Sequence, residues 1–314
     1  MKKFIARLAL LAVIMLLVIV VMHVVAVWRM QDELEAVYTV SPSTEVLFLG
    51  SSQVGCSIAE DPAGRIRKLW VSDTIVPSCL MRLKELERRG QLDRLKVVVV
   101  PFNIHSVMAQ SERGYLWAWY LELPVAWRYL DMLPYGRLDL AWYMLRNLRF
   151  PFRMILSEVP PDRDALADRP EAYRRKMLAQ FRQTARSAQA CGTCPDWERR
   201  LFDDYREMDE ICRRHGIRFV VFKPPLLSDY ERNLPKEALS RIDAYERRLR
   251  EMGIEYVKPQ PALDERHFFD DVHLIRSGAD IFTAELFRLI ELAVTNKPQN
   301  HPNPTTSQMK GKSK

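Results

Sequence analysis

The chain has 314 residues, of which 48% are hydrophobic and 28% charged, and this fits one large globular domain with appendages and excludes disorder throughout. Basic residues at the two ends account for the formal net charge of +7, so the body is neutral and nucleic-acid binding is not expected. These end residues are Lys2, Lys3, Arg7, Lys297, Lys310, Lys312 and Lys314.

An uncharged apolar segment runs from Leu8 to Trp28. It is long enough for a helix to cross roughly 30 Å of hydrocarbon, and it predicts a transmembrane signal anchor within residues 1–30. Basic residues precede the segment and acidic residues follow it, which places the N-terminus in the cytoplasm and the body outside a bacterial inner membrane crossed once. A cleaved signal peptide is the alternative, but the run exceeds the usual apolar region and no A-x-A site follows.

Five cysteines would meet an oxidising compartment if this topology holds. Cys191 and Cys194 have the spacing of a redox motif. No thioredoxin-like strand precedes them, so a local disulfide is the favoured interpretation. The odd count leaves at least one thiol unpaired.

After a linker at residues 31–43, apolar strands alternate with amphipathic helices. The predicted strands lie at residues 45–50, 66–71, 95–102, 217–225 and 254–259, and the predicted helices at residues 77–90, 197–215, 235–252 and 277–293. Glycine follows or ends three of these helices, at Gly90, Gly216 and Gly253. The alternation predicts a three-layer α/β/α domain over residues 44–295 with a doubly wound, mostly parallel five-stranded sheet, whose ligand site lies beyond the carboxyl ends of the strands.

Residues 104–196 do not follow the alternation and are predicted to form a helical insertion. Aromatic residues crowd its first half, residues 115–152. They fit a substrate groove or a bilayer-facing surface, and equally the core of a small helical subdomain. Residues 296–314 lack apolar periodicity and predict a disordered basic tail.

Two short motifs have the residue types of a serine-based active site. Ser52 directly follows the first predicted strand and Gly50-Ser51. Asp270 and His273 lie three residues apart on the loop before the last predicted helix, whereas Asp271 is expected to face solvent or cap that helix. A serine hydroxyl needs a base to take its proton, and the base needs a partner to hold its tautomer. The pattern predicts Ser52 as nucleophile, His273 as base and Asp270 as its orienting partner.

These motifs resemble the SGNH/GDSL hydrolase superfamily. The likeness is to its membrane-anchored branch, which includes DltD of lipoteichoic-acid D-alanylation and the AlgX/AlgJ-type alginate O-acetylation proteins. In that branch Gly-Ser-Ser replaces Gly-Asp-Ser, as at residues 50–52, and the Asp-x-x-His block corresponds to residues 270–273. The resemblance implies a flavodoxin-like fold.

The same resemblance implies an oxyanion hole. Its donors would be the backbone N–H groups of Ser52 and Ser72 and the side chain of Asn103. Ser72 replaces the glycine of the family's second block, and Pro101 replaces the glycine two residues before Asn103. From its position alone, Asn103 could equally cap the turn after its strand.

The resulting expectation is a membrane-anchored, extracytoplasmic serine esterase or O-acyltransferase that acts on acyl esters, acetyl or alanyl, of a cell-surface polysaccharide or teichoic acid. Its expected partners are the membrane, through residues 8–28, a membrane-bound O-acyltransferase and a cell-surface glycan. The alternatives are a non-catalytic scaffold or glycan-binding protein with the same fold, and a lipase or lysophospholipase. No zinc-ligand spacing or glycine-rich phosphate loop occurs in the sequence, so no metal or cofactor is expected.

Overall fold

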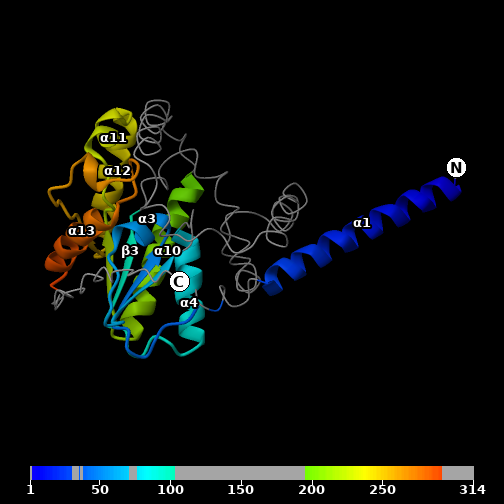
Figure 1. The fold of residues 1–314 in the computed structure, drawn as a ribbon, viewed down its shortest axis with the longest axis horizontal. Coiled ribbons are helices and arrows are strands. Elements are labelled where there is room, and N and C mark those ends of the chain that lie inside the picture. Colours follow the sequence, from blue (N-terminus) through cyan, green and yellow to red (C-terminus); the bar gives the residue numbers. More distant parts are fainter. Residues whose placement is uncertain (1, 30–34, 36–37, 71–75, 103–194, 292–314) are drawn as a thin grey trace, which may run out of the picture.

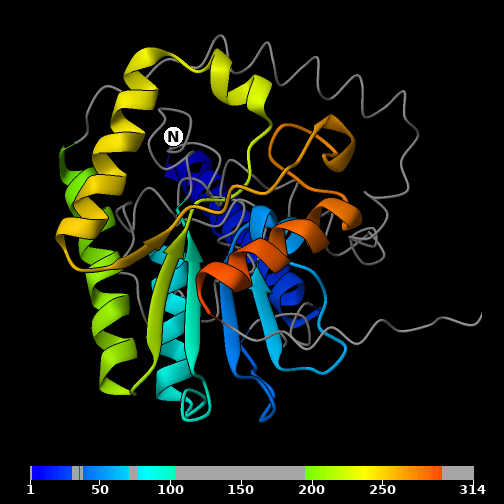
Figure 2. The same ribbon diagram turned by 90° about the vertical axis from the view of Figure 1, so that its left-hand side faces the viewer.

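A parallel β-sheet forms the centre of the chain in a computed structural model, which describes residues 2–29, 35, 38–70, 76–102 and 195–291. The five strands have the order β2-β1-β3-β4-β5, and all neighbours pair in parallel (Figure 2). They are β1 (Val46–Gly50), β2 (Ile66–Trp70), β3 (Val97–Pro101), β4 (Arg218–Phe222) and β5 (Glu255–Val257). The strand order reverses direction between β1 and β3, which is where doubly wound sheets bind their ligands.

Helices cover both faces of the sheet (Figure 1). On one face α4 (Val76–Arg88) packs against α10 (Pro195–Arg214), and α3 (Ser52–Ser57) and α13 (Arg276–Leu289) lie together on the other. The remaining short or connecting helices are α11 (Ser228–Asn233), α12 (Lys236–Glu251) and the 3-10 helix η5 (Glu265–His267). The predicted α/β/α layering is therefore observed.

The central strands form the core because parallel strands covered on both faces lose all contact with water. Every residue of β1 and β3 is buried, whereas the edge strands β2 and β5 are mostly half-buried. Phe48 of β1 packs against Phe222 of β4 and Phe287 of α13, with ring centroids 6.3 and 6.1 Å apart. On the opposite face, Phe202 of α10 meets Tyr245 of α12 edge to face at 5.2 Å.

Glycine ends three helices as predicted. Gly90, Gly216 and Gly253 have φ values of 67°, 67° and 74°, a left-handed conformation that residues with a Cβ rarely adopt. After α10, the Gly216 N–H donates to Arg213 O at 3.1 Å and the Ile217 N–H donates to Cys212 O at 2.8 Å. These bonds satisfy carbonyl groups at the end of α10, so the turn from α10 into β4 is formed by residues close together in the sequence.

The long helix α1 (Lys2–Arg29) extends away from the α/β body (Figure 1). Its described side chains include many exposed apolar ones, such as Val24 at 62% and Trp28 at 71% exposure. Among the helices that the structure describes, none has the combination of length and apolar character that crossing a membrane requires. The span expected at residues 8–28 falls within α1 and stays a prediction.

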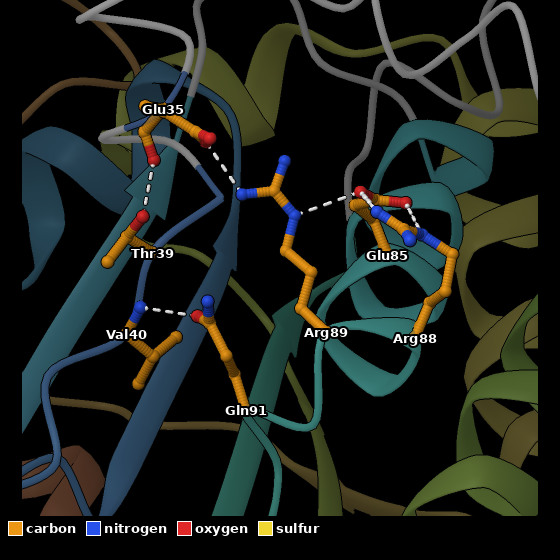
Figure 3. Close-up of polar contacts among 7 residues, drawn as sticks. All are labelled: Glu35, Thr39, Val40, Glu85, Arg88, Arg89 and Gln91. Carbon is orange, nitrogen blue, oxygen red and sulfur yellow. Dashed lines mark hydrogen bonds and ion pairs between the residues drawn. The ribbon is translucent and has the colours of Figure 1, made fainter.

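Residues between α1 and β1 contact the residues at and just after the end of α4 (Figure 3). Arg89 forms an ion pair with Glu35 at 2.6 Å, and its guanidinium lies 5.6 Å from the centroid of the Tyr38 ring. The Val40 N–H donates to the side chain of Gln91 at 2.8 Å. Tyr38 is 1% exposed, so this part of the expected linker belongs to the folded body.

The observed elements match the predicted ones in number of strands and in order. The sequence patterns did not predict α3, α11 or η5, and the strands are shorter than expected. Strand β4 ends at Phe222, just before Lys223 and the two prolines. The helical insertion expected at about residues 104–196 lies almost entirely outside the described residues, and so does the tail at residues 296–314.

Candidate active site

Ser52 lies at a sharp turn from strand to helix. It is the first residue of α3, and only Ser51 separates it from the end of β1. A Cβ on Gly50 would collide with the Val54 side chain and approach Pro101 to 3.0 Å, so only glycine lets β1 and α3 come this close. Ser51 is the N-cap, and its side chain accepts a hydrogen bond from the Gln53 N–H at 3.4 Å.

Ser52, His273 and Asp270 form one continuous chain of hydrogen bonds. The Nε2 atom of His273 lies 2.8 Å from Ser52 Oγ, and Nδ1 lies 2.7 Å from Asp270 Oδ2. A carboxylate only accepts hydrogen bonds, so Nδ1 carries the proton and Nε2 presents its lone pair to the serine. The two motifs, 221 residues apart in the sequence, therefore meet with the geometry of a nucleophile and its base.

Asp270 is buried yet ionised. Burial on its own raises the pKa of this carboxyl, but the hydrogen bond and charge of His273 and the N–H groups of Val272 and His273 outweigh it, so the pKa is lowered. Both N–H groups donate to Oδ1, at 2.9 and 2.8 Å. The carboxylate therefore stabilises the fold above its ordinary pKa, and this contribution is lost as the pH falls through the lowered value.

The triad loop, residues 268–274, is closed on itself by backbone hydrogen bonds. Phe268 and Leu274 form an antiparallel bridge, and the Phe269 N–H donates to His273 O at 2.8 Å. The Leu227 N–H donates to Asp271 O at 2.9 Å, which ties the segment after β4 to the same loop. The loop therefore holds Asp270 and His273 in a fixed relation to the strand ends.

Asp271 does not face solvent or cap α13, as the sequence pattern led us to expect. Its side chain is fully buried. The pKa of Tyr230 is raised to about 12, first by the burial of Tyr230 and then by the charge of Asp271. The expectation was wrong because the closed triad loop turns both of its neighbouring aspartates inward. Helix α13 begins at Arg276 after Ile275, which provides no side-chain cap.

The oxyanion hole is described only at Ser52. As the first residue of α3, its N–H has no acceptor within the helix, and no hydrogen bond from it is found within the described residues. An N–H in this position can stabilise an oxyanion. The two other expected donors, Ser72 and Asn103, lie outside the described residues.

Two residues beneath and beside Ser52 were missed by the sequence analysis. Arg82 of α4 is completely buried, and its Nη1 donates to Leu69 O at 3.1 Å and to Gly50 O at 3.4 Å, at the ends of β2 and β1. Gln53 is 2% exposed directly after the nucleophile. Apolar and charged residues are interspersed along α4, so the sequence does not show that Arg82 points into the core. A single glutamine after Ser52 likewise does not show that its side chain is buried.

Two of the cysteines that the structure describes, Cys56 and Cys212, are free thiols. The prediction of at least one unpaired thiol is thereby confirmed. Cys56 lies one turn after Ser52 in α3, and burial together with the Asp270 charge raises its pKa to about 11, so it is a protonated thiol near neutral pH. The Cys191–Cys194 pair lies outside the described residues.

Within the described part of the chain, no cluster of three or more His, Cys, Asp or Glu side chains has a metal-binding arrangement. The groups at Ser52 are those of acyl transfer by a serine nucleophile: a hydroxyl, a base with a free lone pair, and a buried carboxylate.

Comparisons with known proteins give only distant similarities. No family model matches the sequence, and no curated protein matches it. A crystal structure of a proposed acylhydrolase from Bacteroides fragilis NCTC 9343 is 12% identical, with a TM-score of 0.36 over 79% of this chain and 86% of that one. A GDSL-like lipase from Bacteroides thetaiotaomicron VPI-5482 is 14% identical, with a TM-score of 0.39 over 85% of this chain and 97% of that one. The chemistry of this chain is therefore inferred from the geometry around Ser52.

Proposed function

We propose that the chain is a serine esterase or O-acyltransferase of the SGNH/GDSL type. The observation that carries this proposal is the chain of hydrogen bonds from Ser52 Oγ to His273 Nε2 at 2.8 Å and from His273 Nδ1 to Asp270 at 2.7 Å. Its position at the carboxyl end of β1 in a doubly wound sheet adds support, because such sheets place ligands there.

In the proposed reaction, Ser52 Oγ attacks the ester carbonyl while His273 Nε2 takes its proton. The negative charge that develops on the carbonyl oxygen meets the free N–H of Ser52. Collapse of the tetrahedral intermediate breaks the bond to the alcohol, which leaves with the proton from His273. Water or a sugar hydroxyl then attacks the acyl-serine with His273 again as base, which returns the free serine.

We further propose that the acyl ester belongs to a cell-surface polysaccharide or teichoic acid and that the domain lies outside the cytoplasmic membrane. The support is the exposed apolar surface of α1, the basic residues before it, and the resemblance of the two site motifs to the membrane-anchored branch of the superfamily. For transfer of the acyl group to a glycan, we propose a membrane-bound O-acyltransferase as the partner that supplies it.

The test of the chemistry is Ser52→Ala, assayed with 4-nitrophenyl acetate. We expect turnover to fall by about 10³-fold or more, because the nucleophile is removed while its surroundings stay in place. The matched control is Ser57→Ala, which removes a hydroxyl from the other end of α3 and is expected to keep its activity. Unchanged turnover by folded Ser52→Ala protein would exclude the proposed role.

A non-catalytic scaffold is the second candidate, and it is favoured by the two departures from the family pattern, at Ser72 and Pro101. A serine-directed fluorophosphonate distinguishes the two functions. Labelling at Ser52 supports the enzyme, and labelling that fails in correctly folded full-length protein supports the scaffold.

A further inference from the structure

The side chain of Gln53 is buried in the first turn of α3, directly after the nucleophile. It is 2% exposed, and neither its Oε1 nor its Nε2 has a hydrogen-bond partner within the described part of the chain. Native proteins almost always pair such buried polar atoms, because an unpaired amide loses its hydration without compensation. An unpaired donor and an unpaired acceptor beside a nucleophile are therefore available to a ligand.

Gln53 contributes to a small pocket at the carboxyl end of the sheet. Phe102 directly follows β3 and Lys223 directly follows β4, and these strands lie next to β1 in the order β1-β3-β4. The pocket therefore adjoins the strand end that presents Ser52. Its lining residues are Gln53, Phe102, Lys223, Pro224, Leu226 and Ile242.

The lining defines the chemistry of the group that fits. Most of the walls are apolar, and the Lys223 ammonium already forms an ion pair with Glu231 at 2.5 Å. The Gln53 amide is thus the polar group that lacks a partner. A hydrocarbon chain would leave both of its atoms unpaired, and a cation would lie close to Lys223. A neutral hydroxyl both donates and accepts, so it satisfies Oε1 and Nε2 together.

We propose that Gln53 is a specificity-determining residue that binds a hydroxyl of the substrate, so that the enzyme prefers esters of polyols such as sugars over simple aryl or alkyl esters. This inference rests on the proposed esterase or acyltransferase chemistry at Ser52. It names a group that is recognised near the scissile bond, because the pocket that Gln53 lines lies at the ends of β3 and β4, beside the end of β1 that presents Ser52.

The experiment compares two acetyl esters with the full-length protein and Gln53→Leu. The first ester is methyl 6-O-acetyl-glucoside, which has free hydroxyls, and the second is 4-nitrophenyl acetate, which has none. We expect kcat/KM for the sugar ester to fall by about tenfold or more in Gln53→Leu, because the hydrogen bonds to the hydroxyl are lost. The kcat/KM for 4-nitrophenyl acetate is expected to stay within about twofold.

Thermal unfolding separates recognition from a structural role. Leucine removes an unpaired buried amide, so we expect the Tm of Gln53→Leu to equal or exceed that of the wild type. Gln53→Met, which keeps the length of the side chain, is expected to show the same selective loss if leucine disturbs the fold. Ser57→Ala on the same helix is expected to change neither ester.

Each other outcome has a definite meaning. Equal losses on both esters, or no loss on either, would overturn the role of Gln53 while leaving the chemistry of Ser52 intact. A wild type that hydrolyses 4-nitrophenyl acetate but not the sugar ester would overturn it as well. A wild type that hydrolyses neither ester and does not label with a fluorophosphonate would remove the proposed function itself, and this inference with it.

Discussion

The two oxygens of the Asp270 carboxylate have separate tasks. Oδ1 accepts the N–H groups of Val272 and His273, and Oδ2 accepts from Nδ1 of the His273 ring. The backbone bonds thereby orient the carboxylate, and the carboxylate selects the tautomer in which Nε2 has its lone pair toward Ser52. The proposed reaction thus depends on the proton at Nδ1 of His273, whose position Oδ2 of Asp270 determines.

The variant Asp270→Asn tests this assignment. The amide oxygen would keep the two backbone bonds, so the amide NH₂ would face Nδ1 and force the proton onto Nε2, where it blocks the base. We expect kcat for 4-nitrophenyl acetate to fall on the order of 10³-fold, as for loss of the correct tautomer in other serine triads. Steady-state kinetics on folded protein provide the measurement.

The chain offers a matched control for that variant in a second Asp-x-x-His pair. Asp264 is half-exposed and caps η5, where Nδ1 of His267 lies 3.0 Å from Asp264 Oδ1. Asp264→Asn changes the same chemical group four residues before the triad loop, at a side chain that pairs with Arg266 and His267. Activity that fell equally in both variants would speak against a specific role of Asp270.

At the scale of the elements, the site depends on how closely α13 approaches η5. A Cβ on Gly278 would lie 2.5 Å from His267 O and 3.0 Å from His267 Cβ. The Ile275 N–H donates to the same His267 carbonyl at 3.0 Å, directly after the triad loop. The first turn of α13 and the loop that holds His273 are thus one packed unit.

Gly278→Ala is expected to destabilise this unit. The added methyl meets backbone that cannot move aside without shifting the loop, so we expect a loss of about 1–3 kcal/mol in the free energy of unfolding, together with reduced kcat. Urea unfolding and the esterase assay measure the two effects. Ser277→Ala, at the exposed neighbouring position, is expected to show neither, and equal behaviour of the two variants would contradict the close approach.

At the scale of the whole molecule, Arg89 connects the segment after α1 to the α/β body. Arg88 and Arg89 both pair with the buried Glu85, whose pKa is lowered to about 2 first of all by the hydrogen bond from Arg88 (Figure 3). Arg89 also contacts Glu35 and the ring of Tyr38. Glu35 and Tyr38, which precede β1 in the chain, are therefore held against the end of α4.

The pair Arg89→Ala and Arg88→Ala measures this connection. We expect Arg89→Ala to lower the free energy of unfolding by about 1 kcal/mol more than Arg88→Ala, because the contacts with Glu35 and Tyr38 are lost in addition. Urea unfolding of the full chain at low ionic strength is the appropriate measurement. Equal losses would show that the segment adds nothing to the stability of the body.

The sequence by itself determined the parts of this protein that local chemistry controls. Apolar β-branched runs specify buried parallel strands, and Gly90, Gly216 and Gly253 end helices because glycine adopts the left-handed backbone without strain. Ser52, Asp270 and His273 were recognisable because nucleophile, base and carboxylate follow short motifs at strand and loop ends. Each of these signals depends on residues within a few positions of one another.

The sequence motifs assigned the triad to Asp270 and His273, but only the tertiary structure provides the physical reason why this pair, and not Asp264 with His267, serves Ser52. Asp264 with His267 and Asp270 with His273 have the same spacing, and both pairs place a carboxylate beside Nδ1. Only His273 comes within 2.8 Å of Ser52, because β1 and the triad loop meet at the same end of the sheet. The burial of Gln53 and Arg82 was decided in the same way, since burial depends on neighbours that are distant in the sequence.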